Sequence, residues 1–243
     1  GKMASSKGNV IALPDALRVY QPEVLRYIFA VNKVDHEFAI SFDLDVITIY
    51  EAYDRTERMT WGVDAAKNEE VLAKEKRVYE LSQIDGVPSV MPYQVPFRQL
   101  TTLLQTYSGD IDAVIAKLGD VKPEQEECLR RRCECAWYWV KECAPEDFKF
   151  ALREDGSKAD LSGDFLNAIK RIRDEVVIKL ESYQVDKDLQ QAMYDIAKEI
   201  GIDPKALFTS MYQVLIAKDQ GPRLASFMKI IGKDKLNKLL ENY

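Results

Sequence analysis

The sequence is poor in histidine and has no long apolar run. His36 is the only histidine among 243 residues, so a two-histidine metal site or a mechanism that needs two histidines cannot be completed within this chain. We assign His36 no role. No segment approaches the roughly 20 apolar residues of a membrane-spanning helix, and no basic segment leads into an apolar stretch. We therefore expect a cytoplasmic protein with no membrane partner.

The chain has no excess of positive charge. The chain has 34 Lys and Arg against 40 Asp and Glu, a formal net charge of −6. Bulk charge therefore cannot attract nucleic acid, and any nucleic-acid binding has to come from local basic patches. The hydrophobic content of 47% is that of an ordinary globular protein, with one large domain or two modest ones.

The cysteines lack the C-x2-C spacing that is typical of zinc sites. They are Cys128, Cys133, Cys135 and Cys143. They could form a metal cluster or be four thiols of one helix. Helical spacing places Leu129, Cys133, Ala136, Val140 and Cys143 on one stripe, where a free cysteine behaves as a small apolar residue. We favour the second interpretation and expect no metal.

The apolar pattern predicts a mostly α fold with at most a few short strands. Helices are expected over about 43–61, 67–81, 100–107, 111–118, 123–144, 161–182, 186–200 and 235–240, and others begin at 22, 204 and 222. Alternation indicates a strand only over 38–42 and, weakly, over 148–152. No strand–helix–strand repeat is present, so this chain holds no half of a dinucleotide-binding fold. Pro88, Pro92 and Pro96 cannot lie inside one helix and mark a first boundary.

The first nine residues combine two lysines, two serines and two glycines. Ammonium, hydroxyl and free backbone N–H groups suit a loop that binds phosphate oxygens. A flexible lysine also supplies a point charge where negative charge develops on a leaving pyrophosphate. By composition alone, such a segment is more often a disordered chain end or a cloning remnant than a phosphate-binding loop.

The order of these residues is more specific. Lys2-Met3-Ala4-Ser5-Ser6-Lys7-Gly8-Asn9 resembles the K-M-S-K-S loop of class I aminoacyl-tRNA synthetases, in the K-M-S-S-S-K-G-N form. Further similar segments are residues 13–15, 22–27, 42–45, 53–58, 144–150 and 221–224. Together they are similar to the class I lysyl-tRNA synthetases. The resemblance covers essentially the whole chain, as the C-terminal half or so of such an enzyme.

This resemblance implies a set of ATP-binding residues: Lys2, Met3, Ser5, Ser6 and Lys7. Lys2 and Lys7 would be catalytic, contacting the ATP phosphates as lysyl-adenylate forms, with Mg2+ as the counterion of ATP. Ala4 replaces the first serine of the motif, and Ser5 stands where the class pattern has its second lysine. Lys7 could supply that charge instead, so the relative importance of Lys2 and Lys7 stays open.

The resemblance also implies a missing part. The class has a second signature, His-x-Gly-His, which a chain with one histidine cannot contain. We therefore expect an upstream catalytic half in the same protein. We also expect that this chain alone does not aminoacylate and holds no bound cofactor.

The same family relationship implies three regions and a tRNA partner. Residues 1–12 would be the catalytic-loop remnant, 13–95 a stem-contact region with a connecting helix, and 96–243 an α-helical anticodon-binding cage. From residue 218 to the end, the chain has six basic residues and three acidic ones. Further basic clusters lie at 170–173 and 130–132. Aromatic rings beside arginines can stack unpaired bases. We expect tRNA(Lys), and not DNA, to contact Arg223, Lys218, Trp137, Arg131 and Arg171.

Three alternatives remain open from the residues. Trp137 could pack in the core beside Cys133, with the neighbouring arginines forming only a solvated face. Trp137 and Trp139 lie about 200° apart around a helix, so we do not expect both to be fully buried. The chain could instead belong to a glutamyl-type or other class I synthetase, or be a helical binding module whose loop match is accidental.

Overall fold

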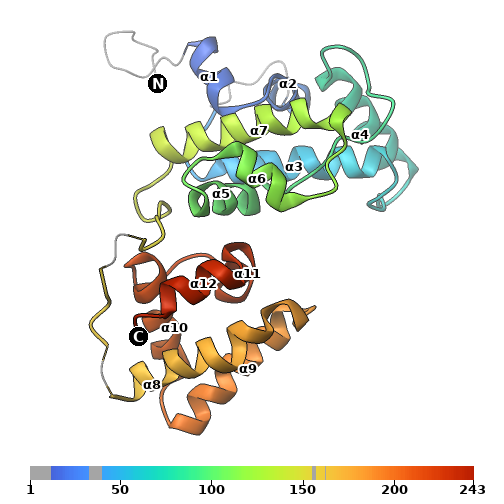
Figure 1. Ribbon diagram of the computed structural model, residues 1–243. Coiled ribbons are helices and arrows are strands. Elements are labelled where there is room, and N and C mark those ends of the chain that lie inside the picture. The colour runs from blue at the N-terminus through green and yellow to red at the C-terminus, as the bar shows by residue number, and fades with distance from the viewer. Residues whose placement is uncertain (1–11, 33–39, 155–156, 162) are drawn as a thin grey trace. The chain divides into compact units, whose positions relative to one another are not determined.

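The computed structural model describes residues 12–32, 40–154, 157–161 and 163–243. The chain forms two compact units, residues 1–149 and 150–243 (Figure 1). Every regular element within the described ranges is helical, which confirms the expected mostly α fold. None of these helices combines the length and apolar content needed to cross a membrane.

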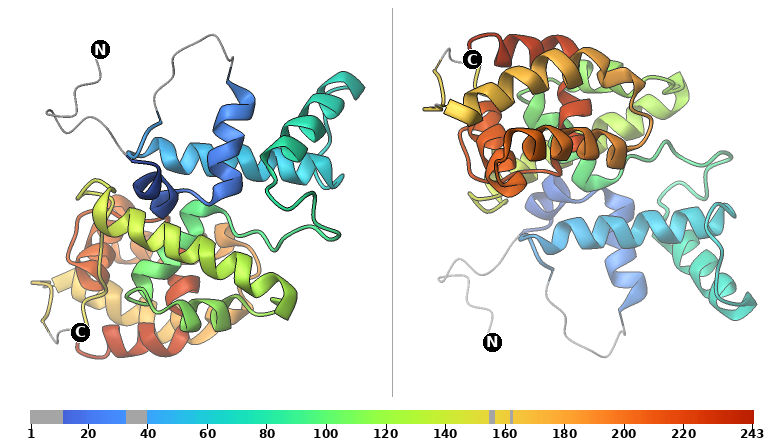
Figure 2. Two further views of the ribbon diagram at one scale, coloured as in Figure 1. Left: turned by 90° about the horizontal axis from the view of Figure 1, so that it is seen from above. Right: turned by 90° about the horizontal axis from the view of Figure 1, so that it is seen from below.

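The N-terminal unit contains seven helices in its described part. They are α1 (Leu13–Val19), α2 (Pro22–Val31), α3 (Asp45–Thr60), α4 (Glu69–Ser82), α5 (Phe97–Thr106), α6 (Ile111–Leu118) and α7 (Pro123–Glu142). Helix α4 packs on α2 and α3, and α7 packs on α1, α5 and α6 (Figure 2). Pro22 and Pro123 occupy first-turn positions, where a missing N–H costs nothing.

The cysteine stripe of α7 packs as expected. Leu129, Cys133, Ala136 and Val140 are buried, and Cys143 at the helix end is half-buried. Burial raises the pKa of Cys133 to about 12 and that of Cys135 to about 11, so both remain unreactive thiols. Within the described ranges, no group of three or more His, Cys, Asp or Glu side chains could hold a metal ion.

The C-terminal unit begins with α8 (Gly163–Arg171) and continues through a π-helical turn η2 (Ile172–Val176) and a 3-10 turn η3 (Val177–Ser182). Then follow α9 (Asp186–Ile200), α10 (Pro204–Ile216), α11 (Leu224–Ile231) and α12 (Lys233–Leu240). The helix expected over about 161–182 is confirmed from 163 to 182, although its geometry changes from α through π to 3-10 along its length. The predicted cap of α10 is confirmed, since Asp203 Oδ1 accepts a hydrogen bond from the Lys205 N–H at 3.3 Å.

The strand expected over 148–152 is wrong: a turn and irregular backbone occupy these residues. Phe148 packs edge-on against Trp139 of the N-terminal unit, and Phe150 packs against Phe227 of the C-terminal unit. The alternating pattern thus reflects side chains that enter two different cores. Of the other expected strand, 38–42, residues 38 and 39 lie outside the described ranges, and 40–42 are irregular.

The packing boundary lies between residues 149 and 150, whereas the expected functional boundary lies at 95/96. Helix α5 packs on α3, α6 and α7, so residues 97–142 are part of the N-terminal core. The division into stem-contact and anticodon-binding regions remains a prediction about function.

Candidate functional site

The predicted ATP-binding residues, Lys2, Met3, Ser5, Ser6 and Lys7, lie outside the described residues, as does His36. The first described element after them is α1, a helix of seven residues. The described residues include the side chains that hold α1 in place and the surfaces that carry the predicted tRNA contacts.

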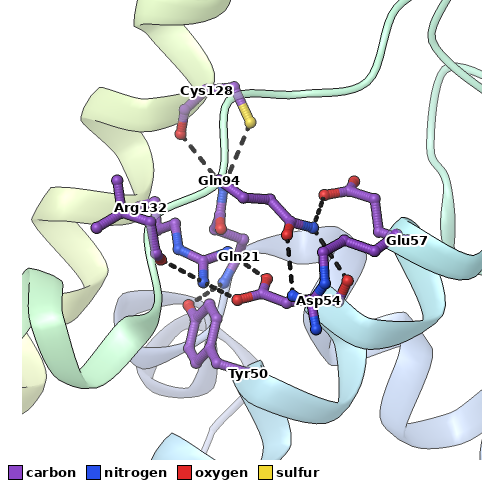
Figure 3. Close-up of polar contacts among 9 residues, drawn as sticks. Gln21, Tyr50, Asp54, Glu57, Gln94, Cys128 and Arg132 are labelled. Carbon is purple, nitrogen blue, oxygen red and sulfur yellow. Dashed lines mark hydrogen bonds and ion pairs between the residues drawn. The ribbon is translucent and has the colours of Figure 1, made fainter. Parts of the chain in front are cut away.

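The junction between α1 and α2 is tied to the rest of the unit by one tyrosine (Figure 3). The Tyr50 hydroxyl of α3 donates to the Val19 carbonyl at 3.0 Å and accepts from the Gln21 N–H at 3.0 Å. The Gln21 side chain donates in turn to the Cys128 carbonyl of α7 at 3.3 Å. The Val19 end of this connection is thus hydrogen-bonded to α3, and the Gln21 end is hydrogen-bonded to both α3 and α7.

Beside Tyr50 lies a buried ion pair. Arg132 Nη1 and Nη2 donate to the two carboxylate oxygens of Asp54 at 2.9 and 2.7 Å, and the side chains are only 6% and 3% exposed. Arg132 Nη2 also donates to the Val95 carbonyl at 3.2 Å, and the guanidinium carbon lies 4.9 Å from the centre of the Tyr50 ring. The buried charge is tolerated because Asp54 and Val95 pair both Nη atoms, although the buried Nε of Arg132 has no hydrogen-bond partner.

A second buried carboxylate extends the network. Glu57 accepts from the Tyr79 hydroxyl at 2.7 Å and from Gln94 Nε2 at 2.5 Å. Burial raises the pKa of Glu57 above its ordinary value, and these two donors oppose that shift. Gln94 belongs to the proline-rich segment, so this network attaches an irregular stretch to α3 and α4.

The network was missed by sequence reasoning, which grouped Arg132 with Arg130 and Arg131. One pattern could have revealed it: Arg132 follows Leu129 by three residues and precedes Ala136 by four, on the apolar stripe of α7. A charged residue at such a position implies a buried partner.

The other arginines and the tryptophans of α7 lie in different environments. Arg130 pairs with Asp112 and Glu126 at 2.8 and 2.9 Å, while Arg131 is exposed. Trp139 is fully buried and its indole N–H donates to the Phe42 carbonyl at 3.0 Å. Trp139, rather than Trp137, is therefore the core residue.

Trp137 is half-exposed and lies against the turn between α5 and α6. A Cβ atom at Gly109 would fall 2.3 Å from Cε2 of Trp137, so the indole rests directly on the glycine backbone. One part of the ring is thus used in packing, and the exposed part can still meet a ligand.

In the C-terminal unit, the residues predicted to contact tRNA differ in whether an ion pair already holds them. Arg171 is held by Glu175 at 2.6 Å and by Glu199 at 2.7 Å, which neutralises its charge locally. Arg223 is exposed at the N-cap of α11, and among the described residues no ion pair holds it. The Asp186 carboxylate, whose pKa the Arg223 charge helps to lower, is already bound by Lys229 and Ser226. Lys218, after α10, is half-exposed.

Comparison with known proteins gives a consistent family. A family profile described as "tRNA synthetases class I (K)" matches residues 1–85. The chain is 50% identical over 244 residues to the lysine–tRNA ligase of Treponema pallidum (strain Nichols), across all of this chain and 46% of that protein. It is 41% identical to that of Borreliella burgdorferi and 35% identical to that of Thermococcus kodakarensis. The chain spans about half the length of these curated relatives.

Proposed function

Because the chain belongs to the class I lysyl-tRNA synthetase family, we propose that it forms part of an enzyme that attaches lysine to tRNA. The reaction has two steps: ATP-driven formation of lysyl-adenylate, and transfer of lysine to the terminal ribose of the tRNA. The observation that carries this proposal is 50% identity across the whole chain, loop included. Such a match favours a lysine enzyme over a glutamyl-type enzyme and over an accidental match of the loop motif.

Residues 2–9 supply the phosphate-binding loop of the proposed enzyme. Lys2, Met3, Ser5, Ser6 and Lys7 bind the ATP phosphates, with Mg2+ as the counterion, and Lys2 or Lys7 stabilises the charge that develops on the leaving pyrophosphate. The lysine site and the rest of the ATP site lie in the upstream catalytic half of the protein. The chain alone therefore does not aminoacylate. The enzyme works in the cytoplasm, where reduced thiols like these four are stable.

The remaining residues bind tRNA(Lys). Arg223 and Arg131 are exposed cations, Lys218 is half-exposed, and Trp137 presents part of an indole ring. These are the groups that bind phosphates and stack on unpaired bases. Arg171 contributes less than its charge suggests, because two carboxylates already hold it.

The tRNA part of the proposal is tested by direct binding. The chain should bind a tRNA with a UUU anticodon more tightly than the same tRNA with a changed second anticodon base. The two tRNAs share their stems, so the difference isolates anticodon recognition. Equal binding of these and of unrelated tRNAs would exclude specific recognition by this chain.

The ATP part is tested in the full-length protein. Lys7→Ala should slow lysine-dependent ATP–pyrophosphate exchange at least about tenfold, which corresponds to about 1.4 kcal/mol of barrier. Lys2→Ala is the matched variant within the same loop. Wild-type exchange in Lys7→Ala would leave Lys2 as the catalytic lysine, and wild-type exchange in both variants would contradict the assignment of the loop.

A further inference from the structure

We propose that Tyr50 is a positioning residue for the phosphate-binding loop and acts on it through α1. This inference rests on the proposed function, because it takes residues 2–9 as the ATP-binding loop. It concerns a residue of α3 that contacts neither ATP nor tRNA in that assignment.

The first step is the weakness of α1 by itself. A helix of seven residues is too short to be stable in isolation, so its position depends on tertiary contacts. Its C-terminal end is followed at once by Tyr20, Gln21 and the first residue of α2. The direction of α1 is therefore set by its packing against α7 and by the hydrogen bonds at this junction.

The second step is what the Tyr50 hydroxyl does there. It donates to Val19, the last residue of α1, and accepts from Gln21, the N-cap residue of α2, both at 3.0 Å. Val19, Gln21 and Tyr50 are all buried, so water does not readily replace this hydroxyl. A single oxygen thus satisfies one backbone group on each side of the junction and fixes the angle between the two helices.

The third step is the rigidity of Tyr50 itself. Its ring stacks on Phe97 of α5 with centroids 4.0 Å apart and 13° between the planes. The Arg132 guanidinium also lies over the ring, and Arg132 is anchored by Asp54, one turn along α3 from Tyr50. The ring is held by three helices, so its hydroxyl is a fixed reference point for the junction. Burial keeps that hydroxyl protonated, because it raises the pKa of Tyr50 well above its ordinary value.

The experiment replaces one hydroxyl and compares it with a matched one. Tyr50→Phe removes both bonds to the junction and keeps the ring contacts. Tyr53→Phe is the control: Tyr53 is also a buried tyrosine of α3, but its hydroxyl accepts from Gln83 instead of from the α1–α2 junction. Both variants are made in the full-length protein, with thermal unfolding recorded to confirm that each is folded at the assay temperature.

Two readouts are used. Amide hydrogen exchange over residues 12–21 should be faster in Tyr50→Phe than in wild type and unchanged in Tyr53→Phe. In lysine-dependent ATP–pyrophosphate exchange, Tyr50→Phe should lower kcat/KM for ATP by about tenfold or more while KM for lysine stays within about twofold. Tyr53→Phe should stay close to wild type in both constants. A general structural defect would change the lysine and ATP constants together.

The outcomes separate this inference from the proposed function. Unchanged hydrogen exchange at the junction in Tyr50→Phe, or equal ATP constants in the two variants, would overturn the positioning role. An equal loss for ATP and lysine would also overturn it. If the wild-type protein shows no lysine-dependent exchange at all, the proposed function has failed, and faster hydrogen exchange in Tyr50→Phe would still establish the contact itself.

Discussion

Arg132 of α7 and Asp54 of α3 form a bidentate ion pair inside the N-terminal unit, although 78 positions separate them in the sequence. Each side chain exposes 6% or less of its surface, and Arg132 also binds the Val95 carbonyl of the proline-rich segment. Three parts of the chain that are distant in sequence therefore depend on one guanidinium group.

The buried ion pair predicts that removing one of its two charges lowers the free energy of unfolding strongly. Asp54→Asn leaves the Arg132 charge buried without its counter-charge, which should cost about 3–5 kcal/mol of unfolding free energy. The measurement is urea unfolding followed by tryptophan fluorescence. Trp61, Trp137 and Trp139 are the only tryptophans and all lie in the N-terminal unit, so this fluorescence reports that unit alone.

The matched control for this prediction is Asp112→Asn. Asp112 also pairs with an arginine of α7, Arg130, at 2.8 Å, but its side chain is 82% exposed. The loss should be below about 1 kcal/mol, because solvent screens an exposed pair. Similar losses in the two variants would show that Arg132 relaxes to another partner or to water.

Glu57 predicts a pH dependence of stability. Because burial raises its pKa in the folded protein above 4.5, the folded state binds this proton more tightly than the unfolded chain. The resulting stabilisation is complete below the unfolded pKa and is lost as the pH rises through the raised value. The unfolding free energy of wild type, relative to Glu57→Gln, should therefore fall as the pH rises above 4.5. Parallel pH profiles of the two proteins would contradict this assignment.

Local sequence patterns predicted the helices well. Pro22, Pro123 and the Asp203–Pro204 pair mark helix starts where expected, because capping and first-turn preferences act within a few residues. The relationships between distant segments were not predictable in this way. A run of three arginines indicates a charged surface, and nothing near Arg132 in the sequence identifies Asp54 as its partner.

The domain boundary illustrates the same limit. Pro88, Pro92 and Pro96 end regular helix, but they do not end packing, because Gln94 and Val95 bind α3 and α7. The packing boundary instead follows Lys149, where no comparable cluster of prolines occurs. For the candidate site, the order of residues in the loop motif predicts the ATP-binding residues. The ion pairs of Arg171, and the exposure of Arg223 without one among the described residues, could be learned only from the structure.

The contrast between Arg223 and Arg171 predicts unequal effects on tRNA binding. Arg223→Ala should weaken binding and reduce the salt slope of log K by about one charge unit, because a cation that neutralises a phosphate displaces a counterion condensed on the RNA. Arg171→Ala should leave the slope almost unchanged, because Glu175 and Glu199 already neutralise that guanidinium. The measurement is the tRNA dissociation constant at several salt concentrations. Equal slopes for Arg223→Ala and wild type would make Arg223 a structural residue.

The contact between Gly109 and Trp137 predicts how the α5–α6 turn supports the exposed indole. Gly109→Ala places a methyl group 2.3 Å from Trp137 Cε2, at a backbone φ of +82°. Displacing the ring should cost about 1–3 kcal/mol beyond the strain of the positive φ. Gly62→Ala isolates that strain, because φ there is +72° and no atom lies within 4 Å of the added Cβ.

Both variants are compared in urea unfolding, tryptophan emission and tRNA binding. Gly109→Ala should be the less stable of the two, and its emission should shift to longer wavelength because the indole moves further into solvent. If Trp137 stacks on a base, as proposed, tRNA binding should weaken in Gly109→Ala by up to about 1–3 kcal/mol, the usual value of one stacking contact. A displaced indole with unchanged tRNA affinity would assign Trp137 to packing alone, since moving the ring would then have cost the complex nothing.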